Sequence, residues 1–273
     1  MVDGLPLCSL ELFKPIAQVL ANKSVWYRTG PGNTGDQLIH AGAACLFSKI
    51  NTRMASSEER PDFLVWGGGG NLGGFWAASA RERSAMFKLS AALFIPVIIL
   101  PQSAPTPEEK FSSDVIVFAR EGETQKIYPN SRLAPDTALA FDEDISAYRR
   151  RLPTHRLGVF LRRDKDSING RLAHLSLADV ARVSSHYRDY FGIAAQFETV
   201  ATDRLHFAMA AIMLGRRAIL LPNGYFKNRA VYDQWLQPLG CLWGPEKLLE
   251  MVAACDYRPD AIDGLYETAR RSN

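Results

Sequence analysis

The sequence contains few cysteines and almost no excess of charge of either sign. Among its 273 residues are 4 cysteines, 32 Lys and Arg, and 29 Asp and Glu, which leaves a formal net charge of +3. The cysteines form no CxxC pair, which argues against a zinc knuckle or a dense disulfide framework and favours free thiols in a reducing cytoplasm. So small a positive excess gives no reason to expect a nucleic-acid partner.

Long apolar runs are also missing. No segment reaches the roughly 20 apolar residues that a membrane span requires. The first residues lack the basic region and cleavage site of a secretory signal, so we expect a cytoplasmic protein. Residues 5–20 are amphipathic, and we interpret them as a helix packed on its own lobe. The alternative is a helix that docks onto a partner or onto the inner face of the membrane, as in peripheral association.

Short β-branched and aromatic runs alternate with longer amphipathic stretches. This order is expected of parallel sheets flanked by helices. After Phe141 a charged stretch with Pro153 shows no buried-strand pattern, which indicates a linker or a surface helix. We therefore predict an α/β protein with two Rossmann-like lobes, residues 1–145 and 146–273, facing a cleft at the carboxyl ends of their strands.

The strands and helices can be placed from the same patterns. The predicted strands cover 24–29, 62–66, 96–100, 115–119, 132–139, 157–162, 197–201 and 218–221. The predicted helices cover 34–49, 74–93, 122–128, 175–190, 204–214 and 226–236. The polar and glycine-rich motifs described next all follow one of these strands closely.

The first glycine-rich loop, GPGNTGD at 30–36, lies between a strand and a helix. Glycines let backbone N–H groups approach a ligand, and the helix dipole favours negative charge there. We predict that Gly32, Asn33 and Gly35 line the site. Asp36 either caps the helix or accepts a hydrogen bond or proton from a sugar hydroxyl, and the strong capping preference of Asp supports the first option equally.

The second loop, GGGGNLGG at 67–74, contains the glycine spacing of a dinucleotide site. Such a site also needs an acidic residue about 20 residues further on, whereas the next strand leads into Gln102. We therefore discount NAD and predict that Gly69, Gly70, Asn71 and Gln102 line the cleft. The alternative is a tight turn required only for packing.

The segment TDRLH at 202–206 combines an arginine and a histidine at a strand-to-helix junction. We predict that Asp203 is the N-cap and that Arg204, Leu205 and His206 form the first helical turn. A guanidinium binds carboxylate or phosphate with two parallel hydrogen bonds, and first-turn N–H groups add to an anion site. An imidazole, with an ordinary pKa of about 6.5, can give or take a proton.

Further basic residues follow other strand ends. Arg120, Arg162 and Lys227 do so, the last just after the turn that contains Asn223. Converging cations are unfavourable without an anion between them, so we expect a ligand with phosphate and carboxylate groups. Each cation taken singly could instead be a solvated surface charge, and for Arg163 and Lys165 this is an equal alternative.

Two DxD motifs occur, at 142–144 and 164–166. In some glycosyltransferases this motif holds a nucleotide-bound metal. The first lies in the predicted linker, and the second contains Lys165, which would compete for the carboxylates. We therefore predict no metal site.

The motifs GNTGD, GGGGNL, LPQS, ARE, PDTAL, FLRRDK, DRLH and PNGYFK follow one another over about residues 27–227. With these motifs in this order, the sequence resembles the polysaccharide pyruvyl transferase family. The resemblance implies a glycosyltransferase-B type fold, phosphoenolpyruvate as donor, no cofactor or metal, and a sugar acceptor, which we expect to be a lipid-linked oligosaccharide. The first lobe would hold the acceptor and the second the donor.

The resemblance also implies that Arg204 and His206 touch the donor together with an upstream arginine. Arg120 fits that position best and Arg162 second. Our hypothesis is that His206 protonates the donor, Arg204 and Arg120 hold its carboxylate and phosphate, and Lys227 balances charge as phosphate departs.

Two alternative functions stay open from the sequence. One is a nucleotide-sugar glycosyltransferase of the same architecture, which would use a basic diphosphate site. The other is a noncatalytic binding protein of a polysaccharide-assembly complex. The choice of donor distinguishes the glycosyltransferase from the pyruvyl transferase.

Overall fold

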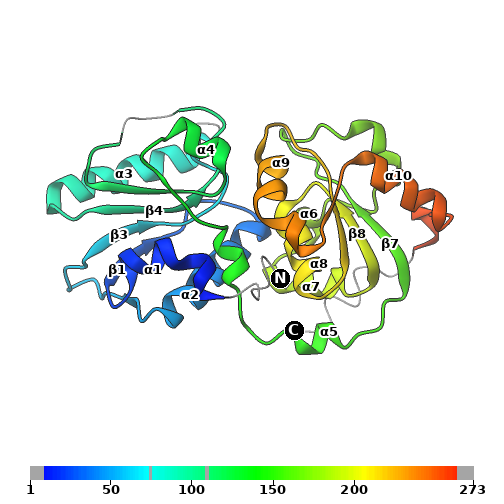
Figure 1. The fold of residues 1–273 in the computed structure, drawn as a ribbon, viewed down its shortest axis with the longest axis horizontal. Helices are drawn as coiled ribbons and strands as arrows, with labels where there is room; N and C mark the ends of the chain where they lie inside the picture. The colour runs from blue at the N-terminus through cyan, green and yellow to red at the C-terminus, as the bar shows by residue number, and fades with distance from the viewer. Residues whose placement is uncertain (1–8, 74–75, 108–110, 263–273) are drawn as a thin grey trace. The chain divides into compact units, whose positions relative to one another are not determined.

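The computed structural model describes residues 9–73, 76–107 and 111–262. The contacts divide them into two units. The N-terminal unit consists of residues 9–32 and 38–142, and the C-terminal unit of residues 33–37 and 143–262. Each unit has its own parallel sheet with helices packed on it (Figure 1). The prediction of a mixed α/β protein with parallel sheets is therefore confirmed.

The sheet of the N-terminal unit has six parallel strands in the order β2-β1-β3-β4-β5-β6. They are β1 (Ser24–Arg28), β2 (Arg53–Met54), β3 (Phe63–Trp66), β4 (Val97–Gln102), β5 (Val115–Ala119) and β6 (Arg132–Leu133). The helices are η1 (Leu10–Phe13), α1 (Lys14–Leu20), α2 (Thr34–Lys49), α3 (Ala77–Leu93), α4 (Gly122–Ile127) and η2 (Thr137–Ala140). The first turn of α2 belongs to the C-terminal unit.

Helices cover both faces of this sheet. On one face Trp66 of β3 and Val97 of β4 belong to one apolar cluster with Met86 of α3. On the other face Tyr27 of β1 meets Phe47 of α2 edge to face, with ring centroids 5.4 Å apart. The alternation of side chains along each strand therefore buries apolar groups in two layers.

The sheet of the C-terminal unit has four parallel strands in the order β10-β9-β8-β7. They are β7 (His155–Phe160), β8 (Phe197–Thr202), β9 (Arg217–Leu220) and β10 (Leu242–Trp243). The helices are α5 (Ser146–Arg149), η3 (Gly170–Leu175), α6 (Val180–Val183), α7 (Tyr187–Ala194), α8 (Leu205–Met213), α9 (Lys227–Val231), the π-helical η4 (Tyr232–Leu236), η5 (Gln237–Leu239), α10 (Pro245–Ala254) and η6 (Pro259–Ala261).

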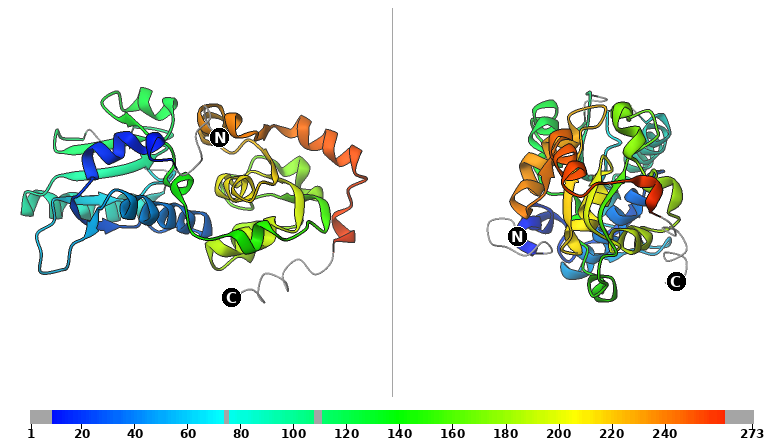
Figure 2. Two further views of the ribbon diagram at one scale, coloured as in Figure 1. Left: turned by 60° about the horizontal axis from the view of Figure 1, so that its bottom comes forward. Right: turned by 90° about the vertical axis from the view of Figure 1, so that its right-hand side faces the viewer.

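This second sheet is also covered on both faces. Val159 of β7 shares an apolar cluster with Leu248 of α10. Phe160, the next residue of β7, points the other way and meets Phe207 of α8 with ring centroids 5.0 Å apart. Figure 2 shows α10 and α8 on opposite sides of the strands. Gly158 is required beside this aromatic layer, because a Cβ there would lie 2.7 Å from the Phe197 ring.

Two of the predicted elements are wrong. The predicted helix 175–190 is instead η3, α6 and α7, because His186 and Asp189 form a reciprocal capping box that starts a new helix at Tyr187. Of the predicted strand 132–139 only β6 exists. Pro135 cannot donate to a ladder, and Asp136 caps η2 by accepting a hydrogen bond from Ala138 N.

Three other expectations concern the stretch after Phe141, the amphipathic segment 5–20 and membrane-spanning helices. The stretch after Phe141 contains the short helix α5. Residues 5–8 of the amphipathic segment lie outside the described residues, and in the rest of it Phe13, Ile16 and Leu20 are buried, as expected of a helix packed on its own lobe. Of the helices in the described ranges, none combines the length and the apolar character needed to cross a membrane.

Candidate functional site in the C-terminal unit

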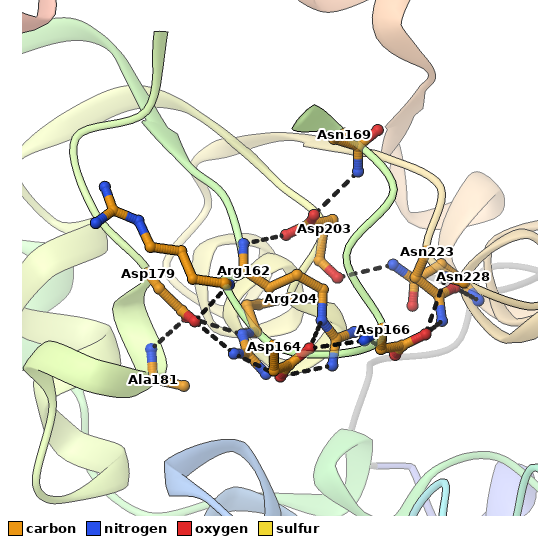
Figure 3. A network of polar contacts seen from close by, with 12 residues as sticks. Arg162, Asp164, Asp166, Asn169, Asp179, Ala181, Asp203, Arg204, Asn223 and Asn228 are labelled. Atoms are coloured by element: carbon orange, nitrogen blue, oxygen red, sulfur yellow. Dashed lines mark hydrogen bonds and ion pairs between the residues drawn. The ribbon is translucent and has the colours of Figure 1, made fainter. Parts of the chain in front are cut away.

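The junction between β8 and α8 carries the DRLH motif. The prediction that Asp203 is the N-cap of α8 is wrong. Arg204 occupies that position, and its side chain makes no capping hydrogen bond. The Asp203 carboxylate instead accepts from Arg162 N (2.8 Å) and Asn169 Nδ2 (2.9 Å). Burial raises the pKa of Asp203, against the effect of these bonds. Asp203 thereby ties the end of β8 to the chain that leaves β7 (Figure 3).

Arg204 is buried and held by two carboxylates. Its Nε and Nη2 donate to Asp179 Oδ1 (2.9 Å) and Oδ2 (2.6 Å). Nη2 also pairs with Asp164 Oδ2 at 2.9 Å. Burial alone would lower the pKa of Arg204, but the hydrogen bonds and charge of Asp179, followed by the charge of Asp164, raise it. The guanidinium is therefore fixed in one orientation and charged at every working pH.

Arg162 lies beside Arg204 and pairs with two aspartates (Figure 3). Its Nε and Nη2 donate to Asp164 Oδ1 (2.8 Å) and Oδ2 (3.1 Å). Its Nη1 lies 2.5 Å from Asp166 Oδ2. Each guanidinium nitrogen of Arg162 therefore faces a carboxylate of its own chain.

Asp166 connects this pair to the turn before α9. It is fully buried and accepts from Asn223 Nδ2 (3.0 Å), Gly224 N (2.9 Å) and Lys227 Nζ (3.2 Å). Gly224 is needed for this approach, since a Cβ there would lie 2.7 Å from Asp166 Oδ1. Two predicted donor residues, Asn223 and Lys227, are thus brought to the arginines through a shared carboxylate.

These residues form a compact group of opposite charges, which we call the arginine–aspartate cluster: Arg162, Asp164, Asp166, Asp179, Arg204 and Lys227. Three aspartates of the chain lie between these three cations, so the anion that the sequence led us to expect there is supplied in part by the protein itself. Two of these aspartates are the DxD motif at 164–166, which the sequence suggested only as a poor metal motif. Nothing in the sequence singled out Asp179.

His206 lies in the first turn of α8 and is partly exposed. Gly35, which belongs to this unit, lies against it: a Cβ on Gly35 would be 2.8 Å from His206 Nδ1. Asn33 Oδ1 accepts from Gly35 N (2.8 Å), and Asp36 Oδ2 accepts from Asn33 N (2.7 Å). Asp36 therefore braces the GNTGD turn. The GNTGD turn therefore lies next to the His206 imidazole. The side chain of Leu205, which precedes His206 in the sequence, is buried.

Arg120, our first choice for the upstream donor-binding arginine, is part of a buried network. It lies in the N-terminal unit with a fully buried side chain. Its Nη1 lies 2.5 Å from Asp136 Oδ2, and its Nε and Nη2 donate to Ser103 Oγ at 2.9 and 2.7 Å. Glu121, which is also fully buried, lies 3.8 Å from Nε. Arg120 thus belongs to an enclosed core network, and Arg162 becomes the stronger candidate.

The GGGGNL loop follows β3 in the N-terminal unit. Gln102 is buried and holds the loop by donating to Gly67 O (2.7 Å) and accepting from Asn71 N (3.1 Å). Gly69 and Gly70 lie between these two contacts, and Gly69 N donates to Pro101 O at 3.0 Å. Gln102 therefore holds the loop in its conformation. This agrees with the alternative interpretation of the loop as a tight turn required for packing. Gly32, in the first loop, is exposed.

Metal binding can be examined directly. In the part of the chain that the structure describes, no group of three or more His, Cys, Asp or Glu side chains is arranged to hold a metal ion. The charges of Asp164 and Asp166 are directed at arginine and lysine instead. That the reaction needs no metal stays a prediction.

The family model described as polysaccharide pyruvyl transferase matches residues 18–225. Among solved structures, a functionally uncharacterised protein from Klebsiella pneumoniae subsp. pneumoniae NTUH-K2044 is similar, with a TM-score of 0.64 and 23% identity over 88% of this chain and 99% of that chain. At this identity the likeness shows the fold alone.

A second solved structure, the wall teichoic acid polymerase TagF, aligns with a TM-score of 0.32 and 7% identity over 96% of this chain and 90% of that chain, too low to support an argument. No curated protein matches the chain. The family match spans well over half of the sequence and includes the two glycine-rich loops and the DRLH motif. The chain belongs to the polysaccharide pyruvyl transferase family and is a transferase enzyme.

Proposed function

We propose that this enzyme transfers the pyruvyl group of phosphoenolpyruvate to two hydroxyls of a sugar, forming a cyclic ketal and releasing phosphate. One observation carries the proposal: two fixed guanidinium groups and a partly exposed imidazole all lie on the chain segments that directly follow β7 and β8. Ligands of parallel α/β sheets bind at that edge. An enol phosphate with a carboxylate offers both the anionic groups and the protonatable carbon that these residues suit.

Donor binding is assigned to Arg162 and Arg204. Nε and Nη2 of Arg162 and Nη2 of Arg204 contact one partly exposed carboxylate, that of Asp164, and a carboxylate or phosphate of a ligand accepts from guanidinium in the same geometry. Lys227, anchored by Asp166, adds a cation that stabilises phosphate as it leaves. Asn223 acts indirectly by orienting Asp166. Leu205, whose side chain is buried, contributes through its position at the start of α8.

His206 is the proposed general acid. Protonating the methylene carbon of the donor makes it a methyl group and leaves the adjacent carbon electrophilic. A sugar hydroxyl oxygen then bonds to that carbon and loses its proton, and the carbon–oxygen bond to phosphate breaks with its electrons on phosphate. A neighbouring hydroxyl adds to the same carbon, loses its proton and closes the ketal. Asp36 is our candidate for accepting a hydroxyl proton.

The remaining assignments follow the family and are proposals as well. We assign the acceptor to the glycine-rich loops, through Gly32, Asn33, Gly69, Gly70 and Asn71, and expect a lipid-linked oligosaccharide used at the cytoplasmic face of the membrane. Because each unit has its own parallel sheet, the glycosyltransferase-B class is the fold type that we propose.

The donor can be tested in two steps. The purified protein is first heated with phosphoenolpyruvate or with UDP-sugars, since a ligand that binds the native state raises the unfolding temperature. It is then incubated with phosphoenolpyruvate and candidate lipid-linked oligosaccharides, and the products are weighed by mass spectrometry. We expect stabilisation by phosphoenolpyruvate and a pyruvyl-sized mass addition. Stabilisation by UDP-sugars alone would favour a glycosyltransferase and contradict the proposal.

A further inference from the structure

Asp164 differs from the other two aspartates of the arginine–aspartate cluster in its exposure. Its side chain is 29% exposed, whereas those of Asp166 and Asp179 are 0% exposed. It lies in the segment without regular structure between β7 and η3. Asp164 is therefore the one carboxylate of the cluster that a small ligand could reach and replace.

The contacts of Asp164 are those of a bound carboxylate. Its two oxygens accept from Nε and Nη2 of Arg162, at 2.8 and 3.1 Å. Oδ2 also pairs with Nη2 of Arg204 at 2.9 Å. A ligand carboxylate binds two arginines through the same parallel contacts. For Arg162 to bind the donor in this way, the carboxylate of Asp164 has to leave its place.

The charges of the cluster lead to the same conclusion. The three cations of the cluster face its three carboxylates, and the buried Asp203 lies close to both arginines as well, so an incoming anion gains little while all of these carboxylates stay. Partial burial would raise the pKa of Asp164, but hydrogen bonds from Arg162 and the charges of Arg162 and Arg204 lower it to about 2. Protonation therefore cannot clear the position at working pH. Movement of the Asp164 side chain toward the surface can.

We propose that Asp164 is a positioning residue that holds Arg162 and Arg204 in the geometry of a bound carboxylate, and that the carboxylate of the donor takes its place. The identity of the donor rests on the proposed function, but replacement by a carboxylate does not. Asp166 and Asp179 stay as permanent counter-charges, so that a single negative charge is exchanged on binding.

The test uses Asp164→Ala with acetate as the probe. Acetate should fill the vacated position, so adding it should raise the unfolding temperature of Asp164→Ala in a saturable manner. In calorimetry the variant should bind acetate on the order of tenfold more tightly than wild type, a difference of about 1.4 kcal/mol. Equal affinity in the two proteins would overturn the proposal. Stabilisation by inorganic phosphate but not by acetate would also overturn it.

Two matched controls separate this effect from simple charge removal. Glu250→Gln removes one exposed carboxylate of the same unit, which pairs with Lys247 on the surface of α10. Asp179→Asn neutralises a fully buried partner of Arg204. Neither change opens the position of Asp164, so acetate should not stabilise either variant. An acetate response in Glu250→Gln equal to that of Asp164→Ala would overturn the proposal.

Asp164→Asn provides a second variant that keeps the side-chain volume in case Asp164→Ala does not fold. It should lower the KM for phosphoenolpyruvate about tenfold without raising kcat, because the competing charge is removed. A purely structural role would lower kcat and leave KM unchanged, which would contradict the proposal. If acetate binds as expected but phosphoenolpyruvate is not turned over even by wild type, the proposed function fails and the role of Asp164 stands.

Discussion

The two units of the molecule each contain an arginine that follows a strand and pairs with aspartate, yet the two centres differ in access to solvent. In the N-terminal unit Arg120 and Asp136 both have fully buried side chains. In the C-terminal unit Arg162 and Arg204 are also buried, but Asp164, which joins them, is partly exposed. The first centre is closed, whereas the second has a counter-charge at its surface.

Under the proposed function, this difference separates the arginines that bind the donor from an arginine of the core. Position after a strand is shared by both centres, so position alone does not separate structure from function. The two centres differ in the exposure of the partner carboxylate, and only an exposed carboxylate can be exchanged for a ligand. The predictions below test the contrast between a closed and an open centre, starting with the largest effect.

Arg120→Ala should destabilise the protein by about 3–5 kcal/mol, the usual result when one partner of a buried ion pair is removed. Asp136 would be left buried without its arginine. Chemical denaturation measures the loss. Arg258→Ala, at a side chain that is 70% exposed, is the control and should change stability by less than about 0.5 kcal/mol. If folded Arg120→Ala bound phosphoenolpyruvate more weakly than wild type, the centre would not be purely structural.

His206→Ala should lower kcat by about 100-fold or more, the range for a lost general acid, while donor binding persists. Steady-state kinetics and calorimetry measure the two effects. His174→Ala is the matched control, because His174 is exposed in the same unit on η3. Turnover of His206→Ala at the wild-type rate would remove the imidazole from the mechanism.

Gly35→Ala should lower kcat by roughly tenfold, since small displacements of a catalytic group can cost up to about 100-fold. The added Cβ would lie 2.8 Å from His206 Nδ1 and push the imidazole aside. Gly170→Ala is the control in the same unit, because a Cβ there meets nothing within 4 Å. Equal kcat values for the two variants would mean that the GNTGD turn does not position His206.

The smallest expected effect concerns pH, because solvent screens the interactions of a partly exposed carboxylate. The pKa of Asp164 is lowered to about 2 in the folded protein, whereas it is about 3.9 in an unfolded chain. Its ionised form therefore stabilises the fold above the unfolded value, and this contribution is lost as pH falls through the folded value. The free energy of unfolding of wild type and of Asp164→Asn should be measured as pH falls from about 4 to about 2. The difference between the two proteins should become smaller over this range. A difference that is constant there would contradict the lowered pKa.

The sequence predicted most strands, because β-branched runs bounded by glycine or polar residues mark buried parallel strands. It also brought out Arg162, Arg204 and His206. It did not predict the aspartates that hold the arginines, because Asp179 is distant along the chain and becomes a partner only through folding. It favoured Arg120 over Arg162 for the same reason: the two arginines differ in the exposure of their partner carboxylates, Asp136 and Asp164, which motif order does not reveal.

The location of the donor is the central claim, and a crystal structure with bound phosphoenolpyruvate tests it most directly. The account predicts the donor carboxylate on Arg162 and Arg204, its methylene carbon next to His206, and the Asp164 side chain turned away from both arginines. Phosphoenolpyruvate bound elsewhere, with Asp164 still paired to Arg162 and Arg204, would contradict it.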